Sequence, residues 1–323
     1  MTQPALPVAS PFLTPADAAC PPEFLALATG AEPRPVAFVR AVGGPILQTA
    51  RDALAAGLAV PILVGETAQI EQDAAAIGWD LAGASIIDAV GEQAAIDAAV
   101  AEVGAGRAQG LIKGQIHTDV FMGTIVRRAS GIRTDRRLVH IFAMLPPGGG
   151  RPLLISDAAV NIAPDVATRT EAALAMAALL RRMGVETPRI AVLSATESRL
   201  PGLPSSLEAA EIATAATEAD DRAAFAGPLS LDLALSPESV AIKGITADSD
   251  SGAVAGYADG LIVPDIVSGN VLFKALAYCA EGLAAGVVLG GRVPIMLTSR
   301  SDPAAARLAS LALAAIAAQE DHS

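Results

Sequence analysis

The chain has 323 residues, of which 52% are apolar but only 3% aromatic, and its formal net charge is −12. That length is enough for one large or two medium-sized α/β domains. An acidic protein of this size is a poor general binder of nucleic acid or anionic membranes, so an anionic ligand must be held by a local basic patch.

Short aliphatic runs alternate along the chain with Ala-rich stretches in which apolar residues recur every three or four positions. Such alternation is typical of strands and helices that follow one another in a mostly parallel sheet. We therefore expect an α/β fold with two doubly wound domains, each built on a mostly parallel sheet. A run of prolines and glycines at 146–150 interrupts the pattern and is the predicted domain break. The runs expected to form strands are 36–39, 61–64, 85–87, 110–112, 138–142, 153–155, 190–193, 261–263, 287–289 and 295–297.

The first polar cluster follows the predicted strand 110–112 and contains Lys113, Gly114 and His117. Ligands of α/β folds bind beyond the carboxyl ends of strands, so Lys113 is a candidate binding residue. Only three of the 22 basic residues are lysines, and those that remain are candidates for a place that needs a compact ammonium. His117 has a side chain suited to acid–base chemistry, although a lone histidine of this kind more commonly caps or packs.

Five arginines lie downstream of this cluster, on a chain that is otherwise acidic. They are a candidate patch for an anionic cofactor, and the alternative is a solvated helix face. These residues are Arg127, Arg128, Arg133, Arg136 and Arg137.

Two further polar turns follow predicted strands. After 153–155, Asn161 offers a neutral hydrogen-bonding group or a cap, and Asp165 is expected to start the next helix. After 261–263, Asp265 leads into a helix that carries Asn270 and Lys274. Both turns are candidate substrate-binding segments. The alternative is that each is an ordinary connection between a strand and a helix.

The last candidate segment follows the predicted strand 295–297 and contains Thr298, Ser299, Arg300 and Asp302. Its hydroxyls and guanidinium precede an Ala- and Leu-rich helix, whose N-terminus suits a phosphate group. Arg300 is able to add a bidentate contact to phosphate oxygens. Asp302 before Pro303 predicts an N-cap followed by a proline at the first helical position.

Several other chemistries have no sequence signal. The chain has no Walker loop, no complete dinucleotide glycine fingerprint and no Gly-x-Ser-x-Gly elbow. Its three histidines and two cysteines lack metal-ligand spacing, so we predict no metal site. No apolar run reaches the roughly 18 residues of a membrane span, and the N-terminal stretch lacks a basic signal-peptide region. We expect a cytoplasmic protein with neither nucleic-acid nor membrane partners.

Taken together, these segments resemble the phosphate acetyl/butyryltransferase family over most of the chain, from about Arg34 to the final helix. Each motif is common alone, but their order and spacing are specific. The motifs are Ile112-Lys113-Gly114, Ser156-Asp157 with Asn161, Gly227-Pro228-Leu229 with Asp232, 254–259, Val263-Pro264-Asp265, Gly269-Asn270 with Lys274, and Thr298-Ser299-Arg300.

The resemblance implies a fold like that of the isocitrate and isopropylmalate dehydrogenases, with the active site in a cleft between two domains and usually a homodimer. One domain would comprise 1–147 and 286–323, and the other 148–285. The implied reaction is acyl-CoA plus phosphate giving acyl phosphate plus CoA, by direct attack in a ternary complex. Coenzyme A is then a substrate, and neither a metal nor a permanently bound cofactor is expected.

The resemblance also implies roles for individual residues. Ser299 matches the family serine that polarises the thioester carbonyl or the thiol, and Arg300 matches the arginine that holds phosphate. These groups would stabilise the oxyanion and bring the attacking phosphate beside it. Substrate binding is expected at Lys113, Asn161, Asn270, Lys274 and Thr298, and CoA binding at Arg127, Arg128 and Arg133.

The chain departs from acetyl-transferring members at two places. Ala305 and Ala306 replace the acid proposed as the base for CoA, and Asp302 is its nearest substitute. Val120 or Phe121 stands where those members carry an arginine. The segments around 194–204 and 297–302 look more like the butyryl branch, so we expect an acyl group longer than acetyl. Three alternatives stay open: a β-decarboxylating dehydrogenase of similar fold, a non-catalytic CoA-binding or regulatory homologue, and an acyltransferase that uses acyl carrier protein.

Overall fold

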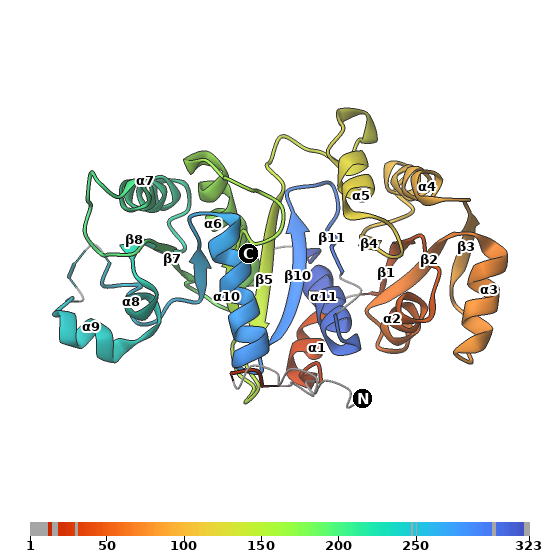
Figure 1. The fold of residues 1–323 in the computed structure, drawn as a ribbon, viewed down its shortest axis with the longest axis horizontal. Helices are drawn as coiled ribbons and strands as arrows, with labels where there is room; N and C mark the ends of the chain where they lie inside the picture. The colour runs from red at the N-terminus through yellow and green to blue at the C-terminus, as the bar shows by residue number, and fades with distance from the viewer. Residues whose placement is uncertain are drawn as a thin grey trace, which may run out of the picture.

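A computed structural model describes residues 12–14, 19–29, 32–246, 248–249, 251–298 and 302–319. Its strands form a single sheet that runs through the whole molecule (Figure 1). In sheet order, the eleven described strands are β3 (Ser85–Asp88), β2 (Ala59–Gly65), β1 (Arg34–Val39), β4 (Leu111–Lys113), β11 (Ile295–Met296), β10 (Leu283–Leu289), β5 (Val139–Leu145), β6 (Leu153–Ser156), β9 (Gly260–Ile262), β7 (Arg189–Leu193) and β8 (Ala224–Leu229).

Helices cover both faces of the sheet, because alternate residues of each strand point to opposite faces and both sets are aliphatic. The helices on the first face are α1 (Pro22–Ala28), α2 (Gly44–Ala55), α3 (Thr67–Ala76), α6 (Val166–Arg182), α7 (Pro204–Ala219) and α11 (Ala304–Ala317). The helices on the second face are α4 (Glu92–Gly104), α5 (Thr118–Ile125), α8 (Leu231–Leu235), α9 (Pro237–Lys243) and α10 (Ile266–Cys279).

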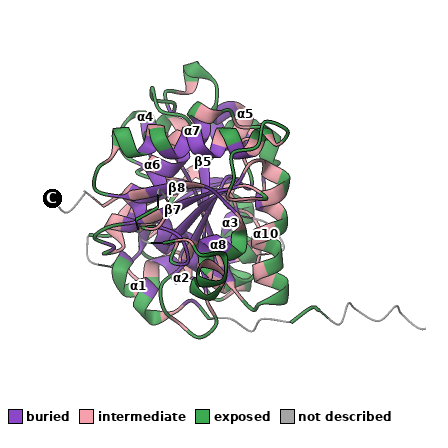
Figure 2. Ribbon diagram, turned by 90° about the vertical axis from the view of Figure 1, so that its left-hand side faces the viewer, coloured by how far each residue is buried: buried purple, intermediate pink, exposed green. Residues whose placement is uncertain are grey.

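The sheet is strongly twisted. Seen end-on, the buried strands fan out at the centre, and α7 and α2 lie on opposite sides although both cover the first face (Figure 2). A rotation of about 20° between neighbouring strands accounts for this, since it accumulates across the sheet. None of the helices described is long and apolar enough to cross a membrane.

The sheet is mostly parallel, as predicted, but it is not divided into two sheets. Three pairings are antiparallel: β10 with β11, β10 with β5, and β5 with β6. Strands β5 and β10 pair along seven residues each. Because β10 also pairs with β11 and β5 with β6, the two strands join one half of the sheet, β3-β2-β1-β4-β11, to the other half, β6-β9-β7-β8. The expectation of a separate sheet for each domain is therefore wrong, because these two strands, distant in sequence, complete each other's hydrogen bonding. The predicted break at 146–150 lies between β5 and β6.

All ten predicted strands are present, and the sequence pattern missed one, β8. Its sequence, AFAGPL, contains a glycine and a proline that normally argue against a central strand. In the structure β8 is an edge strand, and its pairing with β7 shifts register between Ala191 and Leu193. An edge position tolerates Pro228 because one side of the strand needs no partner.

The parallel strands of both halves end at nearly the same height on the sheet. Paired residues form one row across five strands, from Ser156 through Ile141, Val287 and Met296 to Ile112, as the register of neighbouring pairs shows. Ser156 ends β6, and Ile112 lies one residue before the end of β4. With strands about 4.8 Å apart, four steps separate these two ends by about 19 Å. Because three antiparallel pairings separate β6 from β4, the two strands run in opposite directions. The polar turns that follow them therefore lead away from this row toward opposite ends of β5 and β10.

Candidate active site

Two of the predicted site segments meet at the carboxyl ends of β4 and β11. The two strands are parallel neighbours, with Ile112 paired to Met296. Directly beyond them, the Thr298 hydroxyl donates a hydrogen bond of 2.6 Å to the main-chain carbonyl of Lys113. Both residues are buried, with 6% of Lys113 and 8% of Thr298 exposed. The structure thus brings together Lys113 and Thr298, which lie far apart in the sequence.

Gly114 allows the chain to turn sharply after Lys113. A Cβ at this position would lie 2.5 Å from the carbonyl oxygen of Val39 and 2.6 Å from that of Arg40. The Gly114 amide donates to the Val39 carbonyl at 2.9 Å, and the Gln115 amide donates to the Arg40 carbonyl at 3.0 Å. Because main chain from β1 fills this space, only glycine fits without a shift of the backbone. The turn delivers the chain to the start of α5.

A small cavity of about 50 Å³ lies beside this turn. Two helices begin close to it, since its lining includes Pro45 in the first turn of α2 and Arg307 in the first turn of α11. Helix N-termini carry partial positive charge and unpaired N–H groups, so they favour anions. The residues that line the cavity are Pro45, Ile46, Lys113, Gly114, Gln115, Thr298 and Arg307.

Arg307 is a functional candidate that the sequence analysis missed. Its buried guanidinium donates to the Thr49 hydroxyl at 2.8 Å and to the main-chain carbonyl of Asp302. It therefore ties the segment before α11 to α2. The available signal was an arginine among the apolar residues of an Ala-rich helix, but only the fold shows that this helix face is buried.

Ser299 and Arg300 lie outside the described residues, so their predicted roles stay predictions. Asp302 is described, and the prediction that it caps α11 is wrong. The amides of Ala306 and Arg307 donate to the Pro303 carbonyl at 3.1 and 3.2 Å, which makes Pro303 the N-cap. The helix starts one residue later than expected, because Pro303 has an extended ψ of 157°.

The second polar turn, after β6, is organised by the buried carboxylate of Asp157. It accepts hydrogen bonds from the main-chain amides of His140, Ala159 and Val160 at 2.9–3.0 Å, and from the Asn161 side chain at 2.7 Å. The Asn161 amide group also donates to the Leu138 carbonyl at 2.8 Å. Both donors of Asn161 are thus engaged, and its oxygen is the atom available to a ligand.

His140 lies under this turn and is 1% exposed. Burial lowers the pKa of the His140 imidazole to about 4, although the nearby Asp157 carboxylate acts in the opposite direction. The imidazole is therefore neutral near pH 7. Its ring contacts that of Phe142 edge-on, with the ring centres 4.3 Å apart.

Helix α10 approaches the same turn. Asp265 caps it, by accepting from the Ser268 amide at 2.9 Å. A Cβ on Gly269 would lie 2.5 Å from the Asp157 carbonyl oxygen, so glycine permits the close contact. The Asn270 side chain donates to the Ala158 carbonyl at 3.4 Å. Lys274 lies one turn further along and is exposed. Asn270 on α10 therefore contacts the turn that contains Asn161, about four strands away from Lys113 and Thr298.

The predicted arginine patch is not a helix face. It lies in the segment between α5 and β5, at the top of the view in Figure 1. Arg136 pairs with Glu171 at 2.7 Å and Arg137 with Asp165 at 3.4 Å. The side chains of the other three form no ion pair with any described residue and are exposed. These are the predicted CoA-binding residues Arg127, Arg128 and Arg133.

His117 and Glu92 form the polar edge of the site near α5. The His117 imidazole lies 2.8 Å from the Glu92 carboxylate. Desolvation raises the pKa of the Glu92 carboxyl, but hydrogen bonds from the main chain and imidazole of His117 lower it below its ordinary value. The His117 side chain is exposed, and that of Glu92 is partly buried. Within the described ranges, no group of three or more potential ligand side chains is arranged to hold a metal ion.

Comparisons with known proteins agree with the resemblance. Residues 92–315 match the model of the family described as phosphate acetyl/butaryl transferase. The phosphate acetyltransferase of Rhizobium meliloti is 41% identical over 261 residues, which cover 80% of this chain and 81% of that protein. The phosphate butyryltransferase of Clostridium acetobutylicum is 32% identical over 288 residues, covering 89% of this chain and 94% of that protein.

The fold also agrees with that of solved phosphotransacylase structures. The crystal structure of a branched-chain phosphotransacylase from Enterococcus faecalis superposes with a TM-score of 0.77 at 31% identity, covering 88% of this chain and 99% of that one. The fold and the relatives together define an acyltransferase. This chain belongs to the phosphate acetyl/butyryltransferase family.

Proposed function

We propose that the protein transfers a short acyl group between coenzyme A and inorganic phosphate at the carboxyl ends of β4 and β11. The reaction that follows from the family is acyl-CoA plus phosphate giving acyl phosphate plus CoA. The observation that carries the location is the hydrogen bond from Thr298 to the Lys113 carbonyl, which joins two site segments beside the N-termini of α2 and α11. Positive partial charge at both helix ends favours phosphate and a developing oxyanion.

In the proposed mechanism, both substrates are bound together and no acyl-enzyme forms. A phosphate oxygen attacks the thioester carbonyl carbon, the resulting oxyanion collapses, and the carbon–sulfur bond breaks to release CoA. Arg300 would hold the phosphate and Ser299 would polarise the carbonyl or the thiol. Asp302 is the proposed acid–base group, in place of the acid whose position Ala305 and Ala306 occupy. Holding two reactants in line supplies a large part of such a rate enhancement.

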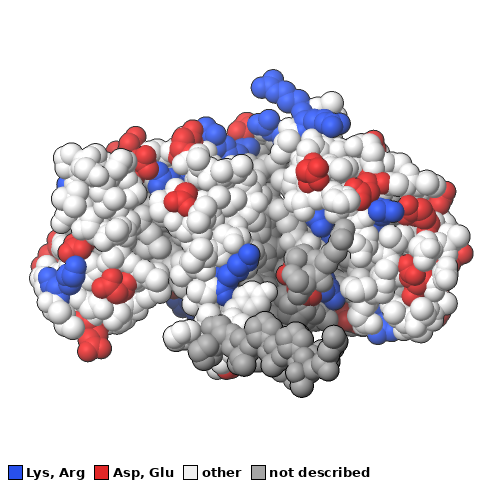
Figure 3. Space-filling model, in the orientation of Figure 1, with Lys and Arg blue, Asp and Glu red and all other residues white. Residues whose placement is uncertain are grey.

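CoA is proposed to approach over the segment between α5 and β5. Its phosphates carry several negative charges, and Arg127, Arg128 and Arg133 offer exposed guanidinium groups there. Figure 3 shows a furrow in the middle of this face, between the half that carries α10 and the half that carries α5, with basic side chains at its upper rim. We propose that the furrow is the cleft between the predicted domains, 1–147 with 286–323 and 148–285, as in a fold like that of isocitrate dehydrogenase. Lys274 and Asn270 lie on α10, which borders it.

The preferred acyl group is proposed to be longer than acetyl. Val120 and Phe121, which are half-buried and buried, stand near the place where acetyl-transferring members carry an arginine. An aliphatic or aromatic side chain accommodates an alkyl group better than a guanidinium does.

A cytoplasmic homodimer is the proposed form of the protein. Helix α10 is rich in apolar residues, yet only Gly269 in it is buried. Val267, Val271 and Tyr278 are 66%, 62% and 54% exposed on its surface. An apolar helix face of this kind marks an interaction site, and a second copy of the chain is the partner that the family resemblance implies.

Release of free thiol from acyl-CoA, with and without phosphate, tests the proposal. The protein should release CoA from a panel of acetyl-, propionyl-, butyryl- and isobutyryl-CoA only when phosphate is present, and with no added metal or cofactor. Thiol release without phosphate, or loss of activity on adding a chelator, would contradict it. No release from any member of the panel would instead support a non-catalytic CoA-binding homologue. Exchange of labelled CoA into acyl-CoA without phosphate would indicate an acyl-enzyme.

A further inference from the structure

Four arginines line a hollow of about 460 Å³ at the end of α11 far from the proposed transfer site. They are Arg34, Arg136, Arg182 and Arg292. No acidic residue is among the described residues that line the hollow, although the chain has 34 acidic and only 22 basic residues. Because acidic side chains predominate in the chain, a cavity wall with this composition needs an explanation.

Elements that are distant in the sequence bring the arginines together. Arg34 begins β1, Arg292 lies in the turn between β10 and β11, and Arg182 ends α6. The last residues of α11 complete the wall at 317–318. Helix α11 runs from the proposed site to this wall over 14 residues. At about 1.5 Å per residue, the two places are about 20 Å apart.

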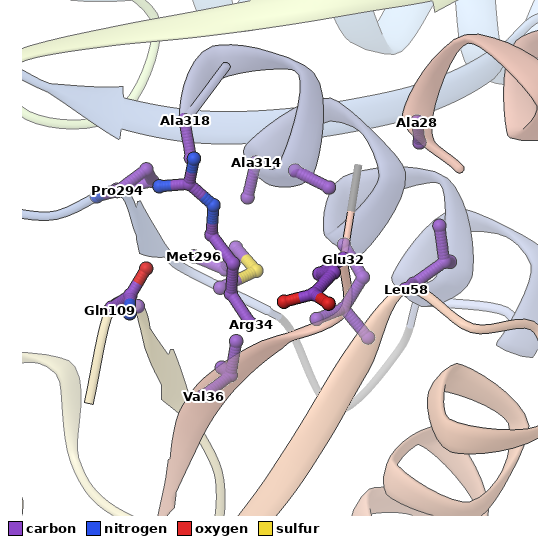
Figure 4. A pocket seen from close by; sticks show the side chains of 13 residues that line it. Ala28, Glu32, Arg34, Val36, Leu58, Gln109, Pro294, Met296, Ala314 and Ala318 are labelled. Carbon is purple, nitrogen blue, oxygen red and sulfur yellow. The ribbon is translucent and has the colours of Figure 1, made fainter. Parts of the chain in front are cut away.

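Two of the four guanidinium groups are available to a ligand. The side chains of Arg34 and Arg292 form no ion pair or hydrogen bond with another residue of the described chain. Arg34 is half-buried, and its guanidinium points away from β1 toward Pro294 and Ala318 (Figure 4). Pro294 and Ala318 line both this hollow and a smaller one of about 30 Å³ beside it. Arg136 shares its charge with Glu171.

Helix electrostatics explains only one of these arginines. Arg182 lies in the last turn of α6, where a cation interacts favourably with the helix dipole. Arg34 begins a strand and Arg292 lies in a turn, so neither gains from that effect. Both nevertheless line the same hollow. A shared anionic ligand accounts for these two arginines.

Apart from the arginines and Gln109, the side chains of the wall are apolar, which limits the kind of anion. Aliphatic side chains and glycines fill the space between the guanidinium groups, and the volume falls in the range of small-molecule sites, roughly 300–1,000 Å³. A single phosphate would leave most of this wall without a contact. The apolar lining residues are Ala175, Ala178, Leu289, Val293, Pro294, Ala317 and Ala318.

We propose that this hollow binds a small organic molecule with at least two phosphate groups, of the nucleoside diphosphate class. The guanidinium groups of Arg34 and Arg292 would hold the phosphates through charge-assisted hydrogen bonds, and the apolar wall would contact the organic part. The site is separate from the transfer site, so its occupation does not depend on the proposed reaction.

Calorimetric titration with ADP and with pyrophosphate tests the proposal. Wild-type protein should bind both probes, and ADP more tightly because it also contacts the apolar wall. Arg34→Gln and Arg292→Gln should each weaken binding by about tenfold or more, the effect of one lost charge-assisted contact. The matched control is Arg199→Gln, an exposed arginine that does not line this hollow, which should bind as wild type does. Circular dichroism should first show that every variant is folded.

A second control separates this hollow from the proposed CoA site, since CoA itself contains a diphosphate. Arg128→Gln should leave unchanged the part of ADP binding that depends on Arg34 and Arg292. Phosphate-dependent thiol release should be unchanged in Arg34→Gln and Arg292→Gln without ADP. The proposal is overturned if wild-type protein binds neither probe at millimolar concentration. It is also overturned if Arg128→Gln abolishes binding while Arg34→Gln and Arg292→Gln do not.

Discussion

The Thr298 hydroxyl and the Lys113 main-chain carbonyl, 2.6 Å apart, fasten the last strand of the chain to a strand about 185 positions earlier. Thr298 directly precedes Ser299 and Arg300, and Lys113 directly precedes the Gly114 turn. One hydrogen bond therefore fixes the starting points of both segments relative to each other. Variants of Thr298 that remove this hydrogen bond should therefore affect both segments.

Thr298→Val should lower both the stability of the protein and the rate of the transfer reaction. It removes the hydroxyl while keeping the shape of the side chain, so the buried Lys113 carbonyl loses a donor at an expected cost of about 1–3 kcal/mol in stability. Urea unfolding and phosphate-dependent thiol release measure the two effects. Thr298→Ser keeps the hydroxyl and is the matched control. Equal stability and rate in the Val and Ser variants would show that the hydrogen bond has no such role.

Arg300→Ala should lose activity mainly through weaker use of phosphate. A lost bidentate, charge-assisted contact corresponds to about 1.5–3 kcal/mol, or roughly 10- to 150-fold. Arg300→Lys should restore little, because an ammonium group cannot reproduce the planar fork. The dependence of the rate on phosphate and on acyl-CoA is measured for each variant.

Arg128→Ala provides the reciprocal control, since it should weaken the use of acyl-CoA and leave phosphate dependence largely intact. An unchanged phosphate dependence in Arg300→Ala would mean that the phosphate site lies elsewhere.

Acidification should destabilise the protein through His140. Burial lowers the pKa of this imidazole to about 4, against 6.5 for an ordinary histidine. Between these values the unfolded chain binds a proton that the folded chain does not. Stability from this group is therefore fully present above pH 6.5 and decreases as the pH falls toward 4, by at most about 3 kcal/mol.

The measurement is the free energy of unfolding at pH values from 8 to 4. His140→Phe has a ring of similar size without a titrating group, and its stability should vary less with pH over this window. A pH dependence as steep as that of the wild type would assign the effect to other groups.

The two cysteines should differ sharply in reactivity. Burial, with a smaller effect of Glu23, raises the pKa of the Cys20 thiol to about 11, whereas Cys279 is exposed at the end of α10. At pH 8 only about 0.1% of Cys20 would be thiolate, the reactive form. A chromogenic disulfide reagent should therefore modify one thiol promptly and the second only in denaturant. Cys279→Ser should abolish the fast phase, and a fast phase that survives this change would place Cys20 in contact with solvent.

The sequence predicted the local structure well and the assembly of the sheet less well. Runs of aliphatic residues mark buried strands, and Asp165 starts α6, as its position indicated. Both signals depend on a few neighbouring residues. The pairing of β5 with β10 joins residues that are far apart in the chain, and no local pattern specifies it. The same reason explains why Arg307 was missed, since its burial depends on α2 and α11 coming together.

The candidate site was predictable only as separate segments. Polar residues after strand ends drew attention to Lys113, Asn161, Asn270 and Thr298, and the structure puts the first and last of these in contact. It also shows that the donors of Asn161 already serve Asp157 and Leu138. That assignment required the position of a buried carboxylate, which residue type and spacing do not reveal.

The continuous sheet determines how the molecule can deform. Two domains joined by flexible linkers would swing about a hinge, and the linkers would carry little elastic energy. Here the halves are joined through the pairing of β5 and β10, along seven residues each, so a change in the angle between the halves must bend or twist this ribbon. The paired strands β5 and β10 therefore resist a change in this angle. Because such a deformation costs free energy, the twist that the paired strands prefer would set the resting width of the furrow.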